Sequence, residues 1–186
     1  SPFTGKDVGA TVIQCRKDHS HTNMAHIIKP AVAVLTDEKS GTTNGGSSVS
    51  TGWTARELNV VRGETWFVSG SFDGLGGTNT NFTLEPGTYE IEAFAPFYNT
   101  AYTQLRLYDV TNSDIAIVGT NCQTVSNNGF INGPVYGVLT LTSSTEYALQ
   151  YRTSTAQATY GLGEDSTFSA AGDKSVFSNV KIRKLK

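Results

Sequence analysis

Hydrophobic and polar residues alternate along residues 82–110, and this pattern predicts β-strands. From Tyr89 to Ala95 the apolar side chains fall on every second position, with Glu90 and Glu92 between them, and residues 103–109 repeat the same period. A Pro-Gly pair precedes the first of these runs, and Pro followed by Gly is typical of a type II turn. We therefore expect the chain to reverse at this turn, with half-buried antiparallel strands on either side.

The same pattern recurs along most of the chain. Clusters of Gly, Ser, Asn and Asp interrupt it roughly every ten residues, and no helical period persists beyond a turn or two. This spacing is typical of β-sandwiches and jelly rolls, and the absence of a fixed repeat argues against a propeller or a solenoid. The predicted fold class is all-β and antiparallel, with strands over residues 53–60, 66–71, 82–84, 88–95, 102–110, 115–118, 133–142, 146–153 and 176–185.

The N-terminal quarter of the chain differs from the rest. Residues 1–39 hold all three histidines and only two candidate strands, 10–15 and 30–35, and residues 40–48 form a run of Ser, Gly, Thr and Asn that resembles a flexible linker. We expect an extended N-terminal arm and linker over residues 1–50, followed by one domain over residues 51–186.

Composition excludes several classes of partner. The chain has 186 residues with 14 basic and 16 acidic side chains, a net charge of −2, so nothing favours binding to nucleic acid or to an anionic membrane. Its apolar runs are far shorter than the ~20 residues of a membrane-spanning helix. Cys15 and Cys122 are too few for a disulfide framework, and we expect both to be reduced, as in proteins made in the cytosol.

An ordered succession of short motifs resembles a domain found repeatedly in bacteriophage virion proteins, which is itself similar to the globular heads of the complement q and tumour necrosis factor family. The resemblance covers about residues 53–186. Its motifs are Trp53-x-x-Arg56-x-Leu58-Asn59, Phe82-x-Leu84-x-Pro86-Gly87-x-Tyr89-x-Ile91, Ala95-Pro96, Leu105-Arg106-Leu107-Tyr108-Asp109 and Gly119. The resemblance implies a jelly roll of about ten strands that assembles as a homotrimer, attached to a virion at one end and binding a partner at the other.

Several of these residues are candidates for core or trimer packing. Trp53 and Arg56 stand three apart on a predicted strand and therefore point to opposite faces, so we expect Trp53 to pack and Arg56 to form an ion pair or an interface contact. The remaining candidates are Tyr89, Ile91, Leu105 and Leu107.

The sequence also supports a trimer independently of the resemblance. Phe94, Phe97 and Tyr98 lie beside Tyr89 and Ile91 in one strand-like segment, so both of its faces carry large apolar groups. Such a strand needs two partners, and the second is either a neighbouring subunit or a loop that covers a thick sandwich.

The metal and catalytic candidates are weak. His19 and His21 would share one side of a strand, and a three-fold axis would gather six imidazoles in an octahedral arrangement, but their segment is polar and loop-like, so we expect no metal. Glu90 and Glu92 have a spacing that suits a glycosidase pair, although alternating glutamates on a solvent face are ordinary. No Gly-x-Ser-x-Gly or phosphate-binding loop occurs. We expect neither an enzyme nor a cofactor.

Exposed aromatic rings are candidate glycan contacts. Tyr98 and Tyr102 flank a short predicted loop, residues 99–101, and are the pair we expect to be exposed for a partner or a glycan.

These features together predict a structural virion protein of a tailed bacteriophage, located on the virion surface. It would decorate the capsid or form a short fibre, bind the major capsid protein or another virion protein through residues 1–50, trimerise with itself, and contact a host surface glycan as a further partner. The alternative is a carbohydrate-binding or receptor-binding module of a tail fibre.

Overall fold

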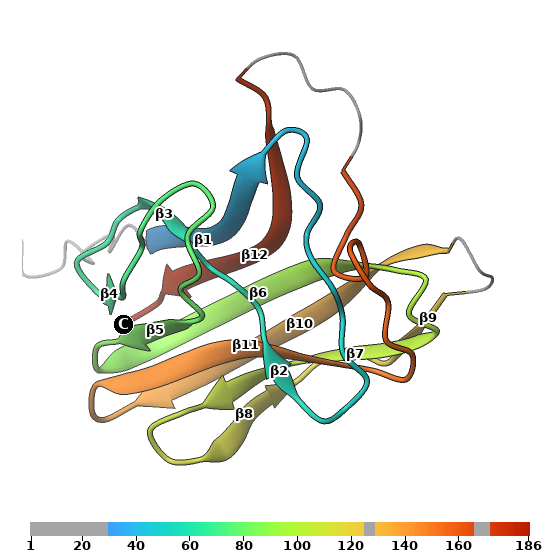
Figure 1. The fold of residues 1–186 in the computed structure, drawn as a ribbon. Coiled ribbons are helices and arrows are strands. Elements are labelled where there is room, and N and C mark those ends of the chain that lie inside the picture. Colours follow the sequence, from blue (N-terminus) through green and yellow to red (C-terminus); the bar gives the residue numbers. More distant parts are fainter. Residues whose placement is uncertain (1–29, 125–128, 166–171) are drawn as a thin grey trace, which may run out of the picture.

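The computed structural model describes residues 30–124, 129–165 and 172–186, and every regular element in them is a β-strand (Figure 1). The strands are β1 (Ala31–Ser40), β2 (Thr54–Ala55), β3 (Val60–Gly63), β4 (Val68–Ser69), β5 (Asn81–Leu84), β6 (Gly87–Tyr98), β7 (Tyr102–Asp109), β8 (Asp114–Val118), β9 (Cys122–Gln123), β10 (Phe130–Leu141), β11 (Thr145–Thr153) and β12 (Lys174–Lys184). The described residues include no helix that could cross a membrane.

The strands form two antiparallel sheets. One has five strands in the order β10-β6-β12-β1-β3, and the other has seven, with β4-β5-β11-β7-β8 along its path, β2 paired with β11 and β9 paired with β7. The sheets lie face to face as a jelly-roll sandwich, which confirms the predicted fold class (Figure 1).

Consecutive strands around the Pro-Gly turn lie in opposite sheets. β5 pairs with β4 and β11, whereas β6 pairs with β10 and β12, and β7 returns to the sheet of β5. The two strands that flank Pro86-Gly87 are present as predicted, and they do not pair with each other. Alternation identifies a strand and its buried face, but it does not identify the neighbour in the sheet.

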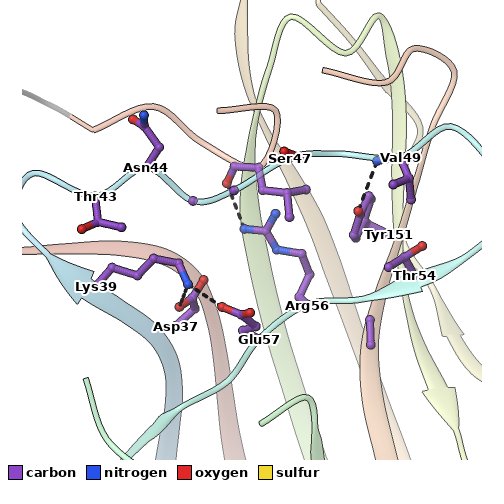
Figure 2. Close-up of a pocket in the computed structure, with 14 residues that line it drawn as sticks. Asp37, Lys39, Thr43, Asn44, Ser47, Val49, Thr54, Arg56, Glu57 and Tyr151 are labelled. Carbon is purple, nitrogen blue, oxygen red and sulfur yellow. Dashed lines mark hydrogen bonds and ion pairs between the residues drawn. The ribbon is translucent and has the colours of Figure 1, made fainter. Parts of the chain in front are cut away.

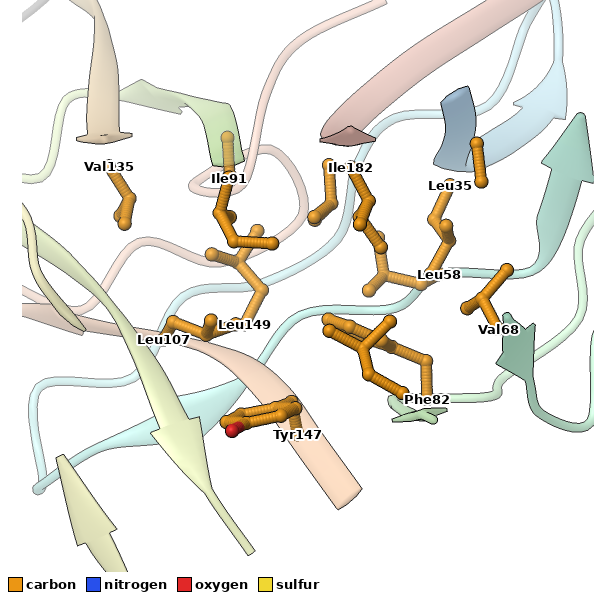
Figure 3. Close-up of a cluster of buried hydrophobic side chains, with 14 of the residues drawn as sticks. Leu35, Leu58, Val68, Phe82, Ile91, Leu107, Val135, Tyr147, Leu149 and Ile182 are labelled. Atoms are coloured by element: carbon orange, nitrogen blue, oxygen red, sulfur yellow. The ribbon is translucent and has the colours of Figure 1, made fainter. Parts of the chain in front are cut away.

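The hydrophobic core fills the space between the two sheets (Figure 3). Along β6 the inward side chains of Tyr89 and Ile91 are buried and the intervening Glu90 is exposed, as the alternation predicts. Leu105 and Leu107 face them from β7 and are also buried. These four candidates for core or trimer packing thus belong to the core of one subunit.

Strand β1 places the start of the sandwich at residue 31, which corrects the boundary predicted near residue 50. β1 lies between β3 and β12, and its Ala33 and Leu35 are fully buried. The candidate strand over 30–35 is the beginning of β1, whose second half, Thr-Asp-Glu-Lys-Ser, is too polar to be recognised by alternation. Residues 1–29 of the predicted arm lie outside the described residues.

The predicted linker packs against the sandwich. The Gly45 amide donates a hydrogen bond to the Gly163 carbonyl at 2.8 Å, and the Ser48 amide donates to the Gln157 carbonyl at 2.9 Å. A Cβ atom on Gly45 would lie 2.4 Å from the carbonyl oxygen of Leu162, so glycine is required there for close backbone approach.

Two other differences between the predicted and the observed strands are local. The strand predicted over 53–60 is two short strands, β2 and β3, and the two-residue β9 was not predicted.

The position of β1 in the sheet has a direct mutational test. Replacing the buried Leu35 with Ala is expected to lower the free energy of unfolding by about 2–5 kcal/mol, because it removes core contacts between the sheets. Leu75→Ala, at a leucine that is 50% exposed, is the matched control and should change it by less than about 0.5 kcal/mol. Equal effects of the two variants in chemical denaturation would contradict the placement of β1.

Candidate functional site

The outer face of the five-stranded sheet carries an apolar strip, defined here as Phe94 on β6 and Phe130, Tyr136 and Val138 on β10. Their exposed fractions are 40%, 59%, 62% and 62%, respectively. The antiparallel register aligns the two strands, because Tyr136 stands opposite Glu92 and Val138 stands opposite Glu90. Large apolar groups thus gather on a face that the rest of the described chain does not cover.

Ion pairs between β6 and β12 border this strip. Glu90 pairs with Arg183 at 3.0 Å and Glu92 pairs with Lys181 at 3.1 Å. All four side chains are partly exposed, so each pair contributes about 0–1 kcal/mol at most. The two glutamates considered as a glycosidase pair thus each have a cationic partner on an open sheet face.

The outer face of the seven-stranded sheet carries a stacked arginine. The guanidinium of Arg106 lies 4.2 Å from the ring centroid of Trp53 and 4.7 Å from that of Tyr108. Its Nε and Nη2 donate to Oε1 of Gln150 at 2.9 and 2.7 Å. Trp53 was expected to pack, and it packs on this cation outside the core.

A groove of about 650 Å³ lies next to this stack at the start of β7. Tyr102, which is 61% exposed, lines it together with Gln104 and Arg152, which stand opposite each other in the β7–β11 register. Its other lining residues are all neutral, namely Ser50, Thr103, Asn121, Thr153 and Ser154. The groove therefore carries a positive charge from Arg152 and no carboxylate.

The two tyrosines predicted as an exposed pair are separated by the fold. Tyr98 ends β6 in the five-stranded sheet and packs edge-on against Tyr160, with ring centroids 5.2 Å apart. Tyr102 begins β7 in the other sheet. The loop between them is present as predicted, and Asn99 and Ala101 adopt positive φ angles of 52° and 56° within it. This loop crosses from one sheet to the other.

Arg56 lines a second cavity, of about 380 Å³, and is almost fully buried (Figure 2). Its Nη2 donates to the carbonyl of Leu162 at 3.0 Å and to that of Phe177, and its guanidinium lies 5.7 Å and 5.9 Å from the ring centroids of Phe97 and Tyr151. Burial lowers the pKa of Arg56 to about 10. The expected ion pair or interface contact is thus replaced by carbonyl and ring contacts within one subunit.

Acidic residues near this cavity are neutralised by neighbouring cations. Lys39 pairs with Asp37 at 3.3 Å and with Glu57 (Figure 2). Burial raises the pKa of Asp37, against the opposing effect of Lys39.

Glu38 points away from that cluster into a second one. Nη2 of Arg62 donates to its Oε2 at 3.0 Å, Thr36 donates to its Oε1 at 2.9 Å, and Lys174 lies 3.4 Å away. Hydrogen bonding from Arg62 is the main reason that the pKa of Glu38 is lowered to about 2.

Metal-binding chemistry has no support in the part of the chain that the structure describes. That part holds no group of three or more His, Cys, Asp or Glu side chains able to bind a metal ion. His19 and His21 lie outside the described residues, as does Cys15. Cys122 is a free thiol, and burial raises its pKa.

Comparison with known proteins supports the fold alone. No protein-family model matches the sequence, and a search of curated proteins found no match. Murine APRIL at pH 5.0 superposes with a TM-score of 0.52 at 10% identity, over 84% of this chain and all of that chain. The globular domain of zebrafish complement 1qA gives a TM-score of 0.45 at 17% identity, over 84% and 97% of the two chains. Eiger TNF from S. frugiperda gives 0.47 at 10% identity, over 85% and 94%. The APRIL likeness agrees with the predicted jelly roll.

The charge of Glu38 predicts how stability depends on pH. Because its folded-state pKa is about 2 and its ordinary value is 4.5, its ion pairs stabilise the fold above pH 4.5, and this contribution is lost as the pH falls from 4.5 towards 2. Glu38→Gln should therefore lower the free energy of unfolding by on the order of 1–3 kcal/mol at pH 7. The free energy of unfolding of this variant should also fall less steeply than that of wild type as the pH drops below 4.5.

The matched control for this prediction is Glu64→Gln, at an exposed glutamate. Urea unfolding of the three proteins between pH 2.5 and 7 measures the effect. If wild type and Glu38→Gln give parallel curves over this range, the assignment is wrong.

Proposed function

We propose that this chain is a non-enzymatic structural protein of a tailed-phage virion, which assembles as a homotrimer and is displayed on the virion surface. The observation that carries the proposal is the apolar strip of Phe94, Phe130, Tyr136 and Val138. Exposed apolar groups that gather on one face are typical of surfaces that another protein covers. The motifs described above, which resemble those of phage virion proteins, support the virion assignment.

The position of the strip favours a ring of identical copies. Most of it lies on β10, an end strand of the five-stranded sheet, so a neighbour can cover the outer face there. When the strip of one copy lies on a different surface of the next, the contact is heterologous, and such contacts form a ring where the rotation between copies closes, as proposed for this trimer. A covering loop of the same chain was the alternative, and none of the described loops covers these four residues.

Attachment to the virion is assigned to the residues before β1. Residues 31–40 belong to the sandwich, so the segment available for anchoring is 1–29, the part of the predicted arm that precedes it. Three anchors on one trimer would bind with an avidity that a single one lacks, because after the first has bound, the others bind intramolecularly. The major capsid protein, or another protein of the shell, is the proposed partner.

The trimer is tested by a matched pair of valines. Val138→Glu places a charge in the apolar strip, whereas Val118→Glu places one on β8 of the other sheet at an almost equal exposure, 62% against 60%. Native mass spectrometry should give three times the 19.9 kDa chain mass for wild type and Val118→Glu, and the monomer mass for Val138→Glu. A monomeric wild type at micromolar concentration, or a trimer of Val138→Glu, would refute the interface.

The virion role is tested by co-sedimentation with particles of the phage that encodes the chain, stripped of this protein. Full-length chain is expected to sediment with the particles, and a variant lacking residues 1–29 is expected to remain in the supernatant while keeping its native mass. Binding by the truncated variant would contradict anchoring by this segment. Failure of the full-length chain to bind would contradict the virion role.

A further inference from the structure

We propose that the groove at the start of β7 binds an oligosaccharide that carries a carboxylate, such as one containing a uronic or sialic acid. The inference deepens the host-contact part of the proposed function by naming a ligand class and a site. It uses the seven-stranded sheet only, so it does not require the interface on the opposite sheet.

Tyr102 supplies a surface on which a sugar ring can stack. Its side chain is 61% exposed and lines the groove. A tyrosine ring has an apolar body and a polar tip, which suits a ligand with both C–H faces and hydroxyl groups. Its backbone is held on both sides: the Tyr102 amide donates to Oγ of Ser154 at 3.0 Å, and the Ser154 amide donates to the Tyr102 carbonyl at 2.9 Å. The ring therefore projects from a fixed strand end, which lowers the entropic cost of binding.

Arg152 supplies the charge that selects an acidic sugar. It is exposed, lines the groove, and its side chain has neither a hydrogen bond nor an ion pair with the described part of the chain. A free guanidinium binds a carboxylate through two parallel hydrogen bonds. Arg106, by contrast, is already bonded to Gln150 and lies over the rings of Trp53 and Tyr108. Since no carboxylate lines the groove, Arg152 favours an anionic ligand over a neutral one.

Two amides provide partners for hydroxyl groups. Nε2 of Gln104 donates to the Gly119 carbonyl at 3.0 Å, which orients the amide and leaves its oxygen free to accept. Asn121 is exposed on the same groove and can both donate and accept. A ring, a free guanidinium, one oriented amide and one exposed amide together match the stacking, charge and hydroxyl groups of an acidic sugar.

The test uses pairs of sugars that differ by one acidic residue. Full-length chain is titrated by calorimetry with 3′-sialyllactose against lactose, and with a glucuronic acid-containing disaccharide against its neutral glucose analogue. At least one acidic sugar is expected to bind, and its neutral counterpart should bind at least tenfold more weakly. Binding of no acidic sugar, or equal binding of acidic and neutral members, would overturn the proposal.

Substitutions of the groove residues test whether the sugar binds in the groove. Arg152→Gln and Tyr102→Ala should each weaken binding at least tenfold, while Arg152→Lys, which keeps the charge but loses the paired hydrogen bonds, should be intermediate. Lys186→Gln removes one exposed positive charge at the end of the chain and is the control, with no expected change. Equal weakening by Arg152→Gln and Lys186→Gln would mean that only net charge matters, and the site would be wrong.

The same samples separate this inference from the trimer. Val138→Glu is titrated beside wild type, and native mass is recorded for both. If Val138→Glu is monomeric and binds the acidic sugar with unchanged affinity per chain, the groove is complete in one subunit, as proposed. If wild type is trimeric and binds no acidic sugar, this inference fails and the assembly proposal stands. If binding is lost with the trimer, the groove needs a neighbour and the single-subunit site is refuted.

Discussion

The buried guanidinium of Arg56 is a central contact at one end of the sandwich, where it joins segments that are distant in sequence and that also contact one another. Its hydrogen bonds reach the carbonyls of Leu162 and Phe177, and its ring contacts, Phe97 and Tyr151, come one from each sheet. A cation removed from water is costly unless its surroundings replace the lost hydration, so the carbonyls and rings must hold their positions. This constraint fixes the end of the sandwich where the loop after β1 and the residues around Leu162 pack together, and it leaves the two outer faces free for other roles.

Those two outer faces differ in chemistry. The five-stranded sheet presents aliphatic and aromatic groups beside charged residues that already form ion pairs. Covering this surface with another protein is favourable because it removes apolar groups from water. The seven-stranded sheet presents aromatic rings, amides and arginines, with a groove that has a free cation. The division suits a subunit that assembles through one sheet and meets a polar ligand through the other.

The sequence predicted elements better than it predicted their partners. Alternation predicted a strand over residues 102–110, and β7 spans Tyr102–Asp109 in the structure. The prediction succeeded because one face of that strand is buried and the other is partly exposed to solvent. It missed the second half of β1, where Asp37 and Glu38 are buried by pairing with cations, so polarity did not indicate exposure there. A carboxylate that is buried because a cation pairs with it in the fold has no signature in a single sequence.

The candidate site was predicted only in part, for a similar reason. The exposed ring of Tyr102 followed from its place beside a short loop, but its separation from Tyr98 depends on which sheet each strand joins. Arg152 was not singled out, because its freedom from any partner is a property of the folded surface. The carbonyl partners of Arg56 are 106 and 121 residues away along the chain, beyond any local pattern.

The central claim is that one outer face is covered by copies of the chain and the other is open. Tyr136 and Tyr102 offer a direct comparison, since they are the same residue type and are 62% and 61% exposed in a single subunit. The measurement is hydroxyl-radical footprinting of the full-length protein at micromolar concentration, read by mass spectrometry at these two tyrosines. The account predicts strong protection of Tyr136 and full reactivity of Tyr102. Equal reactivity of the two rings would contradict it.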